Sequence, residues 1–436
     1  MADNHEPIIN RLPPEILAEV ASHLRDDKSL IVATHVCEYW RRTLLSFPFL
    51  WSHLTFNNEQ RALMFLERAK STLVSIDLID NRKPSKEVKE RLKGIANRIA
   101  ALRAVCAPFL DELLAQPLPT LKNLDLITST FVTSLATTDL GSPLFPRLTN
   151  FRFILRNHPS RFKILPRLGD SLLDFLRNCP QLEVAFFDYG NLGDRDIEFT
   201  TVEEPEMAVS LPRLRSFAHE STIWKIHTGL FNRLSLSHGC DVAFTTTGVW
   251  CPCHPWGRGF PTLRGLSIRE AKIAFHVPNA GSAVIRATFS NSKGTRISLI
   301  TRGVLSIYSC LLPVVEEVLH FPRSSEMTRS IETLHLEHCP IPPLTTHARF
   351  IEPLLELYSL KTLVLSQMLP IYIQESPTLV ALELVRGIAV SRHSYSIPLK
   401  TIALSVYGAE EFQRPFRELV DELRGFIELV EVESSV

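Results

Sequence analysis

Five cysteine and histidine residues within a short stretch of the sequence are the side chains best suited to chemistry. They are His238, Cys240, Cys251, Cys253 and His254. Thiolate sulfur and imidazole nitrogen are the ligands that tetrahedral zinc prefers in proteins. However, the Cys-x-Cys-His order differs from the usual Cys-x-x-Cys pair, and an expected strand over residues 241–247 divides the group. The alternative is a hairpin-like insertion with buried thiols and surface histidines, so we predict no metal ligand and no cofactor.

Catalytic motifs are missing from the rest of the sequence. It contains no Gly-rich phosphate loop, no Gly-x-Ser-x-Gly turn and no His-Glu-x-x-His pair. With 17 glycines against 29 prolines, the chain has little material for loops that cradle a nucleotide. We therefore predict no catalytic residue, and a hydrolase or transferase is the weakest of the functional hypotheses.

The first 56 residues predict three short helices. Pro13 and Pro14 are tolerated at the start of a helix, whose first amides need no internal partner. Apolar residues at helical spacing follow in each segment, and Asp26 and Asp27 offer a cap for the second helix. Pro48 ends the third helix. So small a bundle has a marginal core, which suggests that it also uses a partner surface.

This segment resembles an F-box, the module that joins substrate receptors to cullin-based ubiquitin ligases through a Skp-type adaptor. The residues that carry the resemblance follow one another at the usual spacings: Leu12, Pro13, Pro14, Glu15, Ile16, Leu17, Leu24, Leu30, Val36, Cys37, Tyr39, Trp40, Arg41, Leu50 and Trp51. The resemblance points to the fungal-type F-box-like proteins. A plain structural bundle is the alternative.

The resemblance implies which side chains contact the adaptor. The expected contacts are Leu12, Pro13, Ile16, Leu17, Leu30, Val36, Trp40 and Trp51. Several of them are also expected in the core of the module, so the division between core and interface stays open at this point.

A short aliphatic phrase recurs from residue 117 onward. In its clearest copy an aliphatic residue stands at positions 331, 334 and 336, and Cys339 follows. The nine copies span residues 121–126, 148–153, 182–187, 214–217, 263–268, 331–336, 360–365, 379–384 and 399–404. Their separations resemble the period of leucine-rich repeats, in which each repeat contributes one parallel strand. An ordinary α/β domain with parallel strands is the alternative.

These patterns predict an α/β protein with a small three-helix F-box followed by an irregular leucine-rich-repeat-like α/β solenoid. We expect residues 1–56 to form the F-box and residues 57–116 a helical linker or N-terminal cap, with a helix through residues 95–106. Residues 117–436 would form the repeat domain, closed by an amphipathic helix that starts at Pro415 and runs to Val430.

Composition narrows the possible partners and the compartment. The 47 basic and 47 acidic residues cancel, which argues against nucleic-acid binding. The longest apolar stretch, residues 303–315, is too short to span a membrane, and the first residues do not read as a signal peptide. Eight scattered cysteines do not form a disulfide framework. We therefore expect a cytoplasmic or nuclear protein.

The leading functional hypothesis is a non-catalytic substrate receptor of a cullin-type ubiquitin ligase, with a Skp-type adaptor, a cullin and an unknown target protein as partners. By analogy with the family, the target would contact strand residues such as Asn123, Asp125, Arg152, Arg269, His335 and Val364. The alternative is an F-box scaffold that does not lead to degradation.

Overall fold

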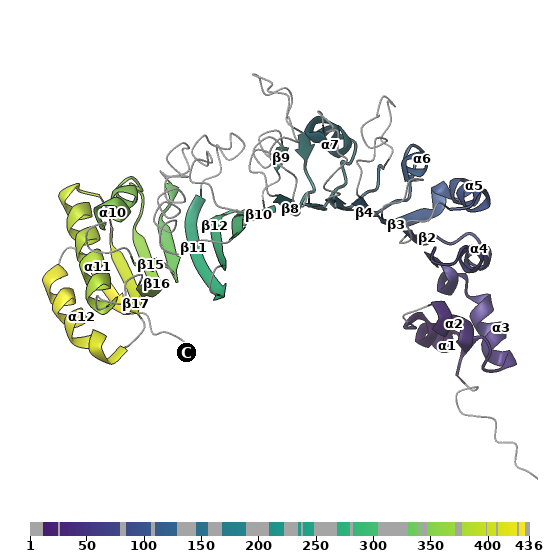
Figure 1. The fold of residues 1–436 in the computed structure, drawn as a ribbon, viewed down its shortest axis with the longest axis horizontal. Coiled ribbons are helices and arrows are strands. Elements are labelled where there is room, and N and C mark those ends of the chain that lie inside the picture. The colour runs from purple at the N-terminus through teal and green to yellow at the C-terminus, as the bar shows by residue number, and fades with distance from the viewer. Residues whose placement is uncertain are drawn as a thin grey trace, which may run out of the picture. The chain divides into compact units, whose positions relative to one another are not determined.

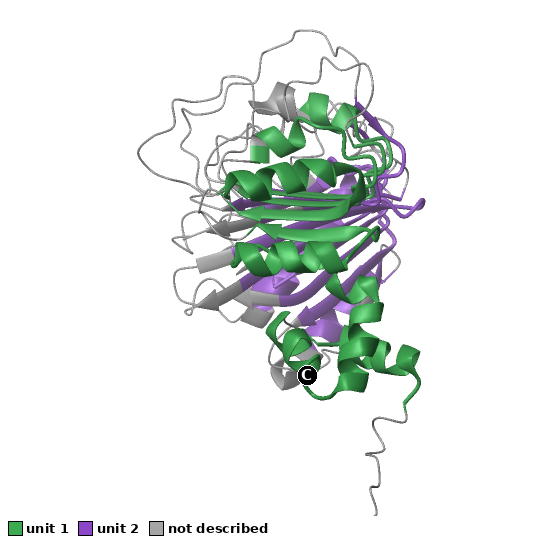
Figure 2. Cartoon of the chain, turned by 90° about the vertical axis from the view of Figure 1, so that its right-hand side faces the viewer, with its two compact units in different colours: residues 1–186 green, residues 187–436 purple. Residues whose placement is uncertain are grey.

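The structure is a computed structural model, and it divides into two compact units. Unit 1 comprises residues 1–186 and unit 2 residues 187–436 (Figure 2). The described residues are 12–24, 27–78, 84–105, 110–128, 145–155, 168–188, 209–221, 234–236, 239–247, 268–279, 282–303, 330–338, 340–341, 347–370, 377–397, 399–406, 409–424 and 427–431.

Unit 1 begins with helices and continues with alternating strands and helices (Figure 1). Its helices are α1 (Pro14–Ser22), α2 (Asp27–Ala33), α3 (Glu38–Ser46), the 3-10 helix η2 (Pro48–Trp51), α4 (Glu59–Arg68), α5 (Lys86–Gly94), the 3-10 helix η3 (Ala96–Arg98), α6 (Leu110–Leu114) and α7 (Leu168–Arg177). Its strands are β1 (His53–Thr55), β2 (Val74–Leu78), β3 (Ile99–Val105), β4 (Asn123–Thr128) and β5 (Asn150–Leu155), and β6 (Val184–Asp188) crosses into unit 2.

Strands β1 to β5 pair in parallel and in chain order. Their register brings one buried apolar residue of each strand into a single row: Leu54, Ile76, Leu102, Leu124 and Phe151. Because side chains alternate between the two faces of a strand, the residues between them point to the other face. From α7, Phe175 packs on the buried row, with its ring 4.5 Å from that of Phe151. The aliphatic phrase therefore buries one face of this sheet.

The predicted helix through residues 95–106 is wrong. Ile99 begins strand β3, which pairs with β2 on one side and β4 on the other. Ile99, Leu102 and Val105 stand at helical spacing, but the strand buries Ile99, Leu102 and Ala104. Apolar spacing alone cannot always tell a helix from a strand. Backbone pairing of β3 on both sides shows that this segment is a strand. Residues 57–116 therefore alternate helices with strands.

Unit 2 is richer in strands, which are β7 (Val209–Leu211), β8 (Ser216–Ser221), β9 (Leu234–Leu236), β10 (Asp241–Thr247), β11 (Ile268–Asn279), β12 (Ser282–Asn291), β13 (Arg296–Gly303), β14 (Thr333–Glu337), β15 (Pro340–Ile341), β16 (Thr362–Pro370), β17 (Thr401–Val406) and β18 (Glu428–Glu431). Its described helices are α10 (His347–Leu355), α11 (Pro377–Ser394) and α12 (Ala409–Leu423).

One strand of the main sheet in unit 2 runs against its neighbours. The order is β8-β10-β13-β12-β11-β14-β16-β17-β18, and only the two pairings of β12 in that series are antiparallel. The register still aligns a row of buried residues across β8 to β17: Phe217, Val242, Ile297, Phe289, Ala271, Leu334, Leu363 and Ile402. The reversal keeps the same face buried, so it does not interrupt the core.

Two sequence predictions for unit 2 need correction. The phrase at residues 379–384 lies inside α11, where Leu379 is exposed and Leu384 is buried. The residues before and after the phrase are also helical, and buried apolar residues continue along the helix to Ile388. The phrase is therefore part of a longer helix. The terminal helix begins at Ala409 with Pro415 inside it and ends at Leu423, and β18 then pairs with β17. The mixed α/β class is confirmed.

Helix α11 is held by two arginines of different kinds. Arg392 is fully buried and donates hydrogen bonds to the carbonyl oxygens of Leu354 (2.6 Å), Leu357 (3.1 Å) and Leu360 (3.1 Å). These carbonyls lie at and beyond the end of α10, where the regular helical bonds end. The carbonyls of Leu354 and Leu357 also accept the backbone amides of Leu357 and Leu360. Burial lowers the pKa of Arg392 to about 10, so the guanidinium stays charged at neutral pH.

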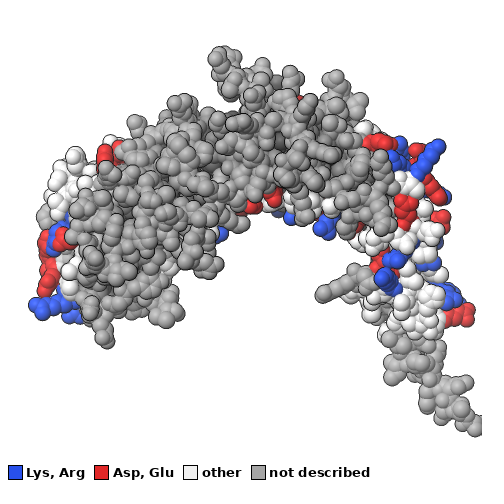
Figure 3. Space-filling model, in the orientation of Figure 1, with Lys and Arg blue, Asp and Glu red and all other residues white. Residues whose placement is uncertain are grey.

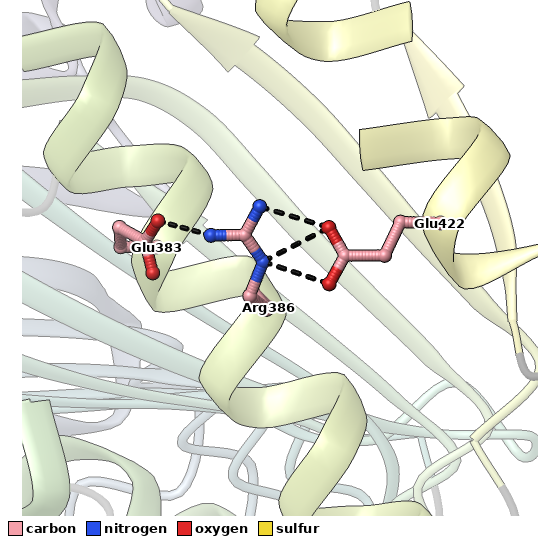
Figure 4. Close-up of polar contacts among 3 residues, drawn as sticks. All are labelled: Glu383, Arg386 and Glu422. Carbon is pink, nitrogen blue, oxygen red and sulfur yellow. Dashed lines mark hydrogen bonds and ion pairs between the residues drawn. The ribbon is translucent and has the colours of Figure 1, made fainter. Parts of the chain in front are cut away.

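Arg386, on the same helix, makes its contacts nearer the solvent. It forms hydrogen bonds with Glu383 of α11 and with Glu422 of α12, the latter at 2.8 Å from Nη2 to Oε2 (Figure 4). These bonds to two carboxylates raise the pKa of Arg386. Its side chain is 38% exposed, so solvent weakens the contribution of these ion pairs to stability.

We predict that Arg392→Met loosens the α10–α11 pair far more than Arg386→Met does. The first change removes three hydrogen bonds from a buried, charged donor, at a cost of about 3 kcal/mol, and the second costs below about 1 kcal/mol. Hydrogen exchange of the α10 amides measures the difference. Equal loss of protection in the two variants would contradict this account of Arg392.

Candidate partner-binding surface

The first four helical elements form a small module that is tied together by side chains bonding to backbone. Tyr39 donates its hydroxyl to the carbonyl of Leu12, and Arg41 Nε donates to the carbonyl of Thr34 at 3.0 Å. Trp51 Nε1 donates to the carbonyl of Leu44, also at 3.0 Å. These bonds connect the start of α1, the end of α2 and η2 to helix α3, so the module has a defined shape despite its small core.

Three of the eight predicted adaptor contacts lie in the interior. Leu17 and Trp51 are completely buried, and Leu30 is nearly so. The ring of Trp51 meets that of Phe65 edge-on at 4.9 Å, and the guanidinium of Arg68 lies 4.3 Å from the centre of the same ring. Phe65 and Arg68 belong to α4, so Trp51 joins the module to the element that follows it.

The other five predicted contacts are at least partly exposed to solvent. Pro13 is exposed, Ile16 is 49% exposed and Val36 is 58% exposed, while Leu12 and Trp40 are half-buried. The structure thus divides the predicted contacts between the core and the surface, a division that the sequence left open. Adaptor contact itself stays a prediction for all eight residues.

Helix α1 carries two apolar stripes. Leu17, Ala18 and Ala21 face the core, whereas Ile16 and Val20 are each 49% exposed. Ile16 and Val20 are four residues apart and therefore share one helical face. The helical spacing of Ile16, Leu17, Val20 and Leu24 in the sequence predicts a single apolar face instead. The signal for two stripes was the pair of small residues, Ala18 and Ala21, beside Leu17.

Exposed large apolar residues are concentrated in this module. We call six of them the apolar set: Ile16, Val20, Leu24, Val32, Val36 and Phe49. Six other exposed large apolar residues are spread over the rest of the described chain. Solvent-exposed apolar side chains gathered in a marginally sized module are typical of a protein-binding surface. Four members of this set are exposed residues that were not among the eight predicted contacts: Val20, Leu24, Val32 and Phe49.

Comparison with known families identifies this segment. Residues 9–57 match the F-box-like family model. The match contains the whole apolar set and all eight predicted contacts. F-box-like domains bind Skp-type adaptors, and their presence indicates an adaptor role in SCF-type ubiquitin ligase complexes.

Five of the six strand positions predicted to meet a target alternate with buried residues and so lie on the face opposite the buried rows: Asn123, Asp125, Arg152, His335 and Val364. The sixth, Arg269, lies where the register between β11 and β12 shifts. In unit 1, Asp77, Arg103, Asp125 and Arg152 follow one another in register across β2 to β5, with alternating charge. Asp125 Oδ2 is 3.5 Å from Arg103 Nε and 3.4 Å from Arg152 Nη1. This row is polar and internally paired.

Unit 2 has ion pairs on the corresponding side of its strands. His335 Nε2 lies 3.4 Å from Glu270 Oε1, and Lys272 Nζ lies 2.8 Å from Glu337 Oε2. Positive and negative side chains also lie interspersed on the molecular face drawn in Figure 3. The polar side of these strands therefore has positive and negative side chains together. A nucleic-acid-binding surface is typically positive throughout.

Of the five cysteine and histidine residues considered as zinc ligands, only Cys240 lies within the described residues. Burial and the nearby charge of Asp241 raise the pKa of its thiol to about 12, which disfavours the thiolate that binds metal. His238, Cys251, Cys253 and His254 lie outside the described residues. Elsewhere in the described parts of the chain, no group of three or more His, Cys, Asp or Glu is arranged to hold a metal ion. None of the described helices is long and apolar enough to cross a membrane.

We predict that Trp51→Ala destabilises unit 1 strongly, whereas Ile16→Ser does not. Loss of the buried indole removes its ring contacts and its hydrogen bond, at a cost of about 3–5 kcal/mol. Ile16 is half exposed, and its replacement leaves the core intact. Thermal unfolding followed by circular dichroism compares the two variants. Similar melting of both would contradict the division between core and surface.

Proposed function

We propose that this chain is the substrate-recognition subunit of a cullin-type ubiquitin ligase. The F-box module would hold a Skp-type adaptor and, through it, a cullin. The observation that carries the proposal is the coincidence of the F-box-like match with the apolar set of residues 16–49. A family that works by docking and an exposed apolar surface fall on the same short segment.

The remaining sheet would be the target-binding part. We infer that residues 117–436 form an irregular leucine-rich-repeat-like solenoid of the fungal-type F-box-like proteins. In support, seven of the nine phrases have described residues on strands with their aliphatic positions buried in both units, and an eighth is described only at Ile268, where β11 begins. The strand residues between the aliphatic positions differ from phrase to phrase, as do those that vary with the target in binding proteins built from repeats. They are polar in three phrases and apolar in three others: Asp125, Arg152 and His335, and Phe186, Val364 and Ala403.

The protein would act by proximity and would carry out no bond chemistry itself. Holding a target near a ubiquitin-charged enzyme raises the effective concentration of the target lysine, which accelerates transfer without a catalytic group from the receptor. Such a receptor works in the cytoplasm or the nucleus, where cullin ligases meet folded targets.

Adaptor binding is tested first on the apolar set. We expect Ile16→Asp/Val20→Asp to weaken capture of a purified Skp-type adaptor by at least about a hundredfold, because two charges would enter an apolar interface. The matched control is Val390→Asp, which changes an exposed valine on α11. Adaptor affinity unchanged in the double variant, or equally reduced in the control, would contradict the assignment.

Ligase and scaffold roles are separated by co-purification from cells. A ligase subunit brings down adaptor and cullin together, along with ubiquitylated proteins that accumulate when the proteasome is inhibited. A scaffold brings down the adaptor without cullin. Recovery of neither adaptor nor cullin would reject both roles.

A further inference from the structure

A groove of about 820 Å³ lies in unit 1, beside the starts of three successive strand segments. It is open to solvent, and its lining residues are Pro119, Thr120, Lys122, Pro146, Arg147, Thr149 and Gln181. Because β4 and β5 are parallel, their starts lie at the same edge of the sheet. The groove is separate from the apolar set, which belongs to the F-box module.

A repeated local sequence builds the lining. Proline, a variable residue, leucine and a second variable residue lead into β4 at positions 119–122, into β5 at positions 146–149 and into β6 at positions 180–183. The leucines, Leu121, Leu148 and Leu182, are completely buried. Anchoring each leucine leaves variable residues on either side of it to line the groove. Glu183 holds the last of these positions but is not part of the lining.

The backbone of these segments is already hydrogen-bonded. The amide of Lys122 donates to the carbonyl of Ala100 at 2.8 Å, and the amide of Thr149 donates to the carbonyl of Lys122 at 2.9 Å. The same carbonyl accepts the hydroxyl of Thr149, and the hydroxyl of Thr120 donates to the carbonyls of Asn97 and Ile99. The hydroxyl protons of both threonines are therefore already used in bonds to backbone carbonyls.

The donors left for a ligand are mostly cationic. Lys122 and Arg147 are exposed, and neither forms an ion pair in the part of the chain that the structure describes. No acidic side chain is among the lining residues that the structure describes. The groove thus has two positive charges, the amide of Gln181 and the rings of two prolines. Its complement is an anionic ligand that also presents apolar surface.

Among anionic ligands, these features favour a peptide. Two cations on a chain with equal numbers of acidic and basic residues make a poor nucleic-acid site. The proline rings and the open shape of the groove suit an extended segment that alternates carboxylates with apolar residues. We propose that this groove binds an acidic, extended peptide segment of the target protein. The inference rests on the proposed receptor function, and it places recognition at the start of the strands.

The test uses the full chain and a fluorescein-labelled ten-residue peptide that alternates glutamate with proline and leucine. We expect saturable binding by fluorescence anisotropy that weakens as salt is raised, because salt screens exposed charges. The counterpart with glutamine for glutamate should not bind. Lys122→Glu/Arg147→Glu should weaken binding of the acidic peptide by at least about tenfold, which corresponds to about 1.4 kcal/mol.

The control is Lys86→Glu/Arg91→Glu, which makes the same charge change on exposed cations of α5 outside the groove. Lys122→Gln/Arg147→Gln repeats the test without adding negative charge, and circular dichroism checks that each variant is folded. No binding to the unmodified chain, equal binding of the glutamine peptide, or equal losses in the control would overturn the proposal. Adaptor capture on the same proteins is independent of the groove, so failure of the receptor function and failure of this site are distinguished.

Discussion

Each strand of this protein buries its aliphatic side chains only with the help of the strand beside it. In unit 1 the row from Leu54 to Phe151 crosses five strands, and each of its residues is in register with the next. A three-residue strand such as β1 would not stay folded alone, since a short isolated strand has neither paired backbone nor a covered face. The stability of each element therefore depends on its neighbours in the row.

The same constraint explains why one reversed strand is tolerated. Strand β12 runs antiparallel between β11 and β13, and yet Phe289 is in register with Ala271 on one side and Ile297 on the other. A shift by one residue would have turned these apolar side chains to the opposite face. Burial of one face is thus the property that the sheet preserves, and strand direction is free to vary where loops permit.

The sequence predicted the strands best where the aliphatic phrase was bounded by proline or polar turns. Residues 121–126 and 331–336 are such cases, and both form strands. It failed at residues 99–105, where Ile99, Leu102 and Val105 stand at helical spacing although the segment is a strand. Long-range pairing decides such a case, and no local pattern contains that information. For the docking surface, the sequence marked the segment but could not tell inward from outward stripes on α1, because both are apolar. The groove near Lys122 was not predicted, since its residues come from three segments that only the sheet brings together.

The link between the F-box module and the sheet is a single residue. Only Ser52 separates Trp51 from the start of β1, and the carbonyl of Ser52 accepts the amide of Ser75, which lies in β2, at 2.8 Å. At the other end of β1, the amide of Phe56 donates to the carbonyl of Asp77, also in β2. Backbone hydrogen bonds between β1 and β2 therefore begin directly after the module, and no flexible linker lies between them. A partner that binds the module therefore also orients strands β1 and β2. The direction of this part of the sheet relative to the module is set by these backbone bonds.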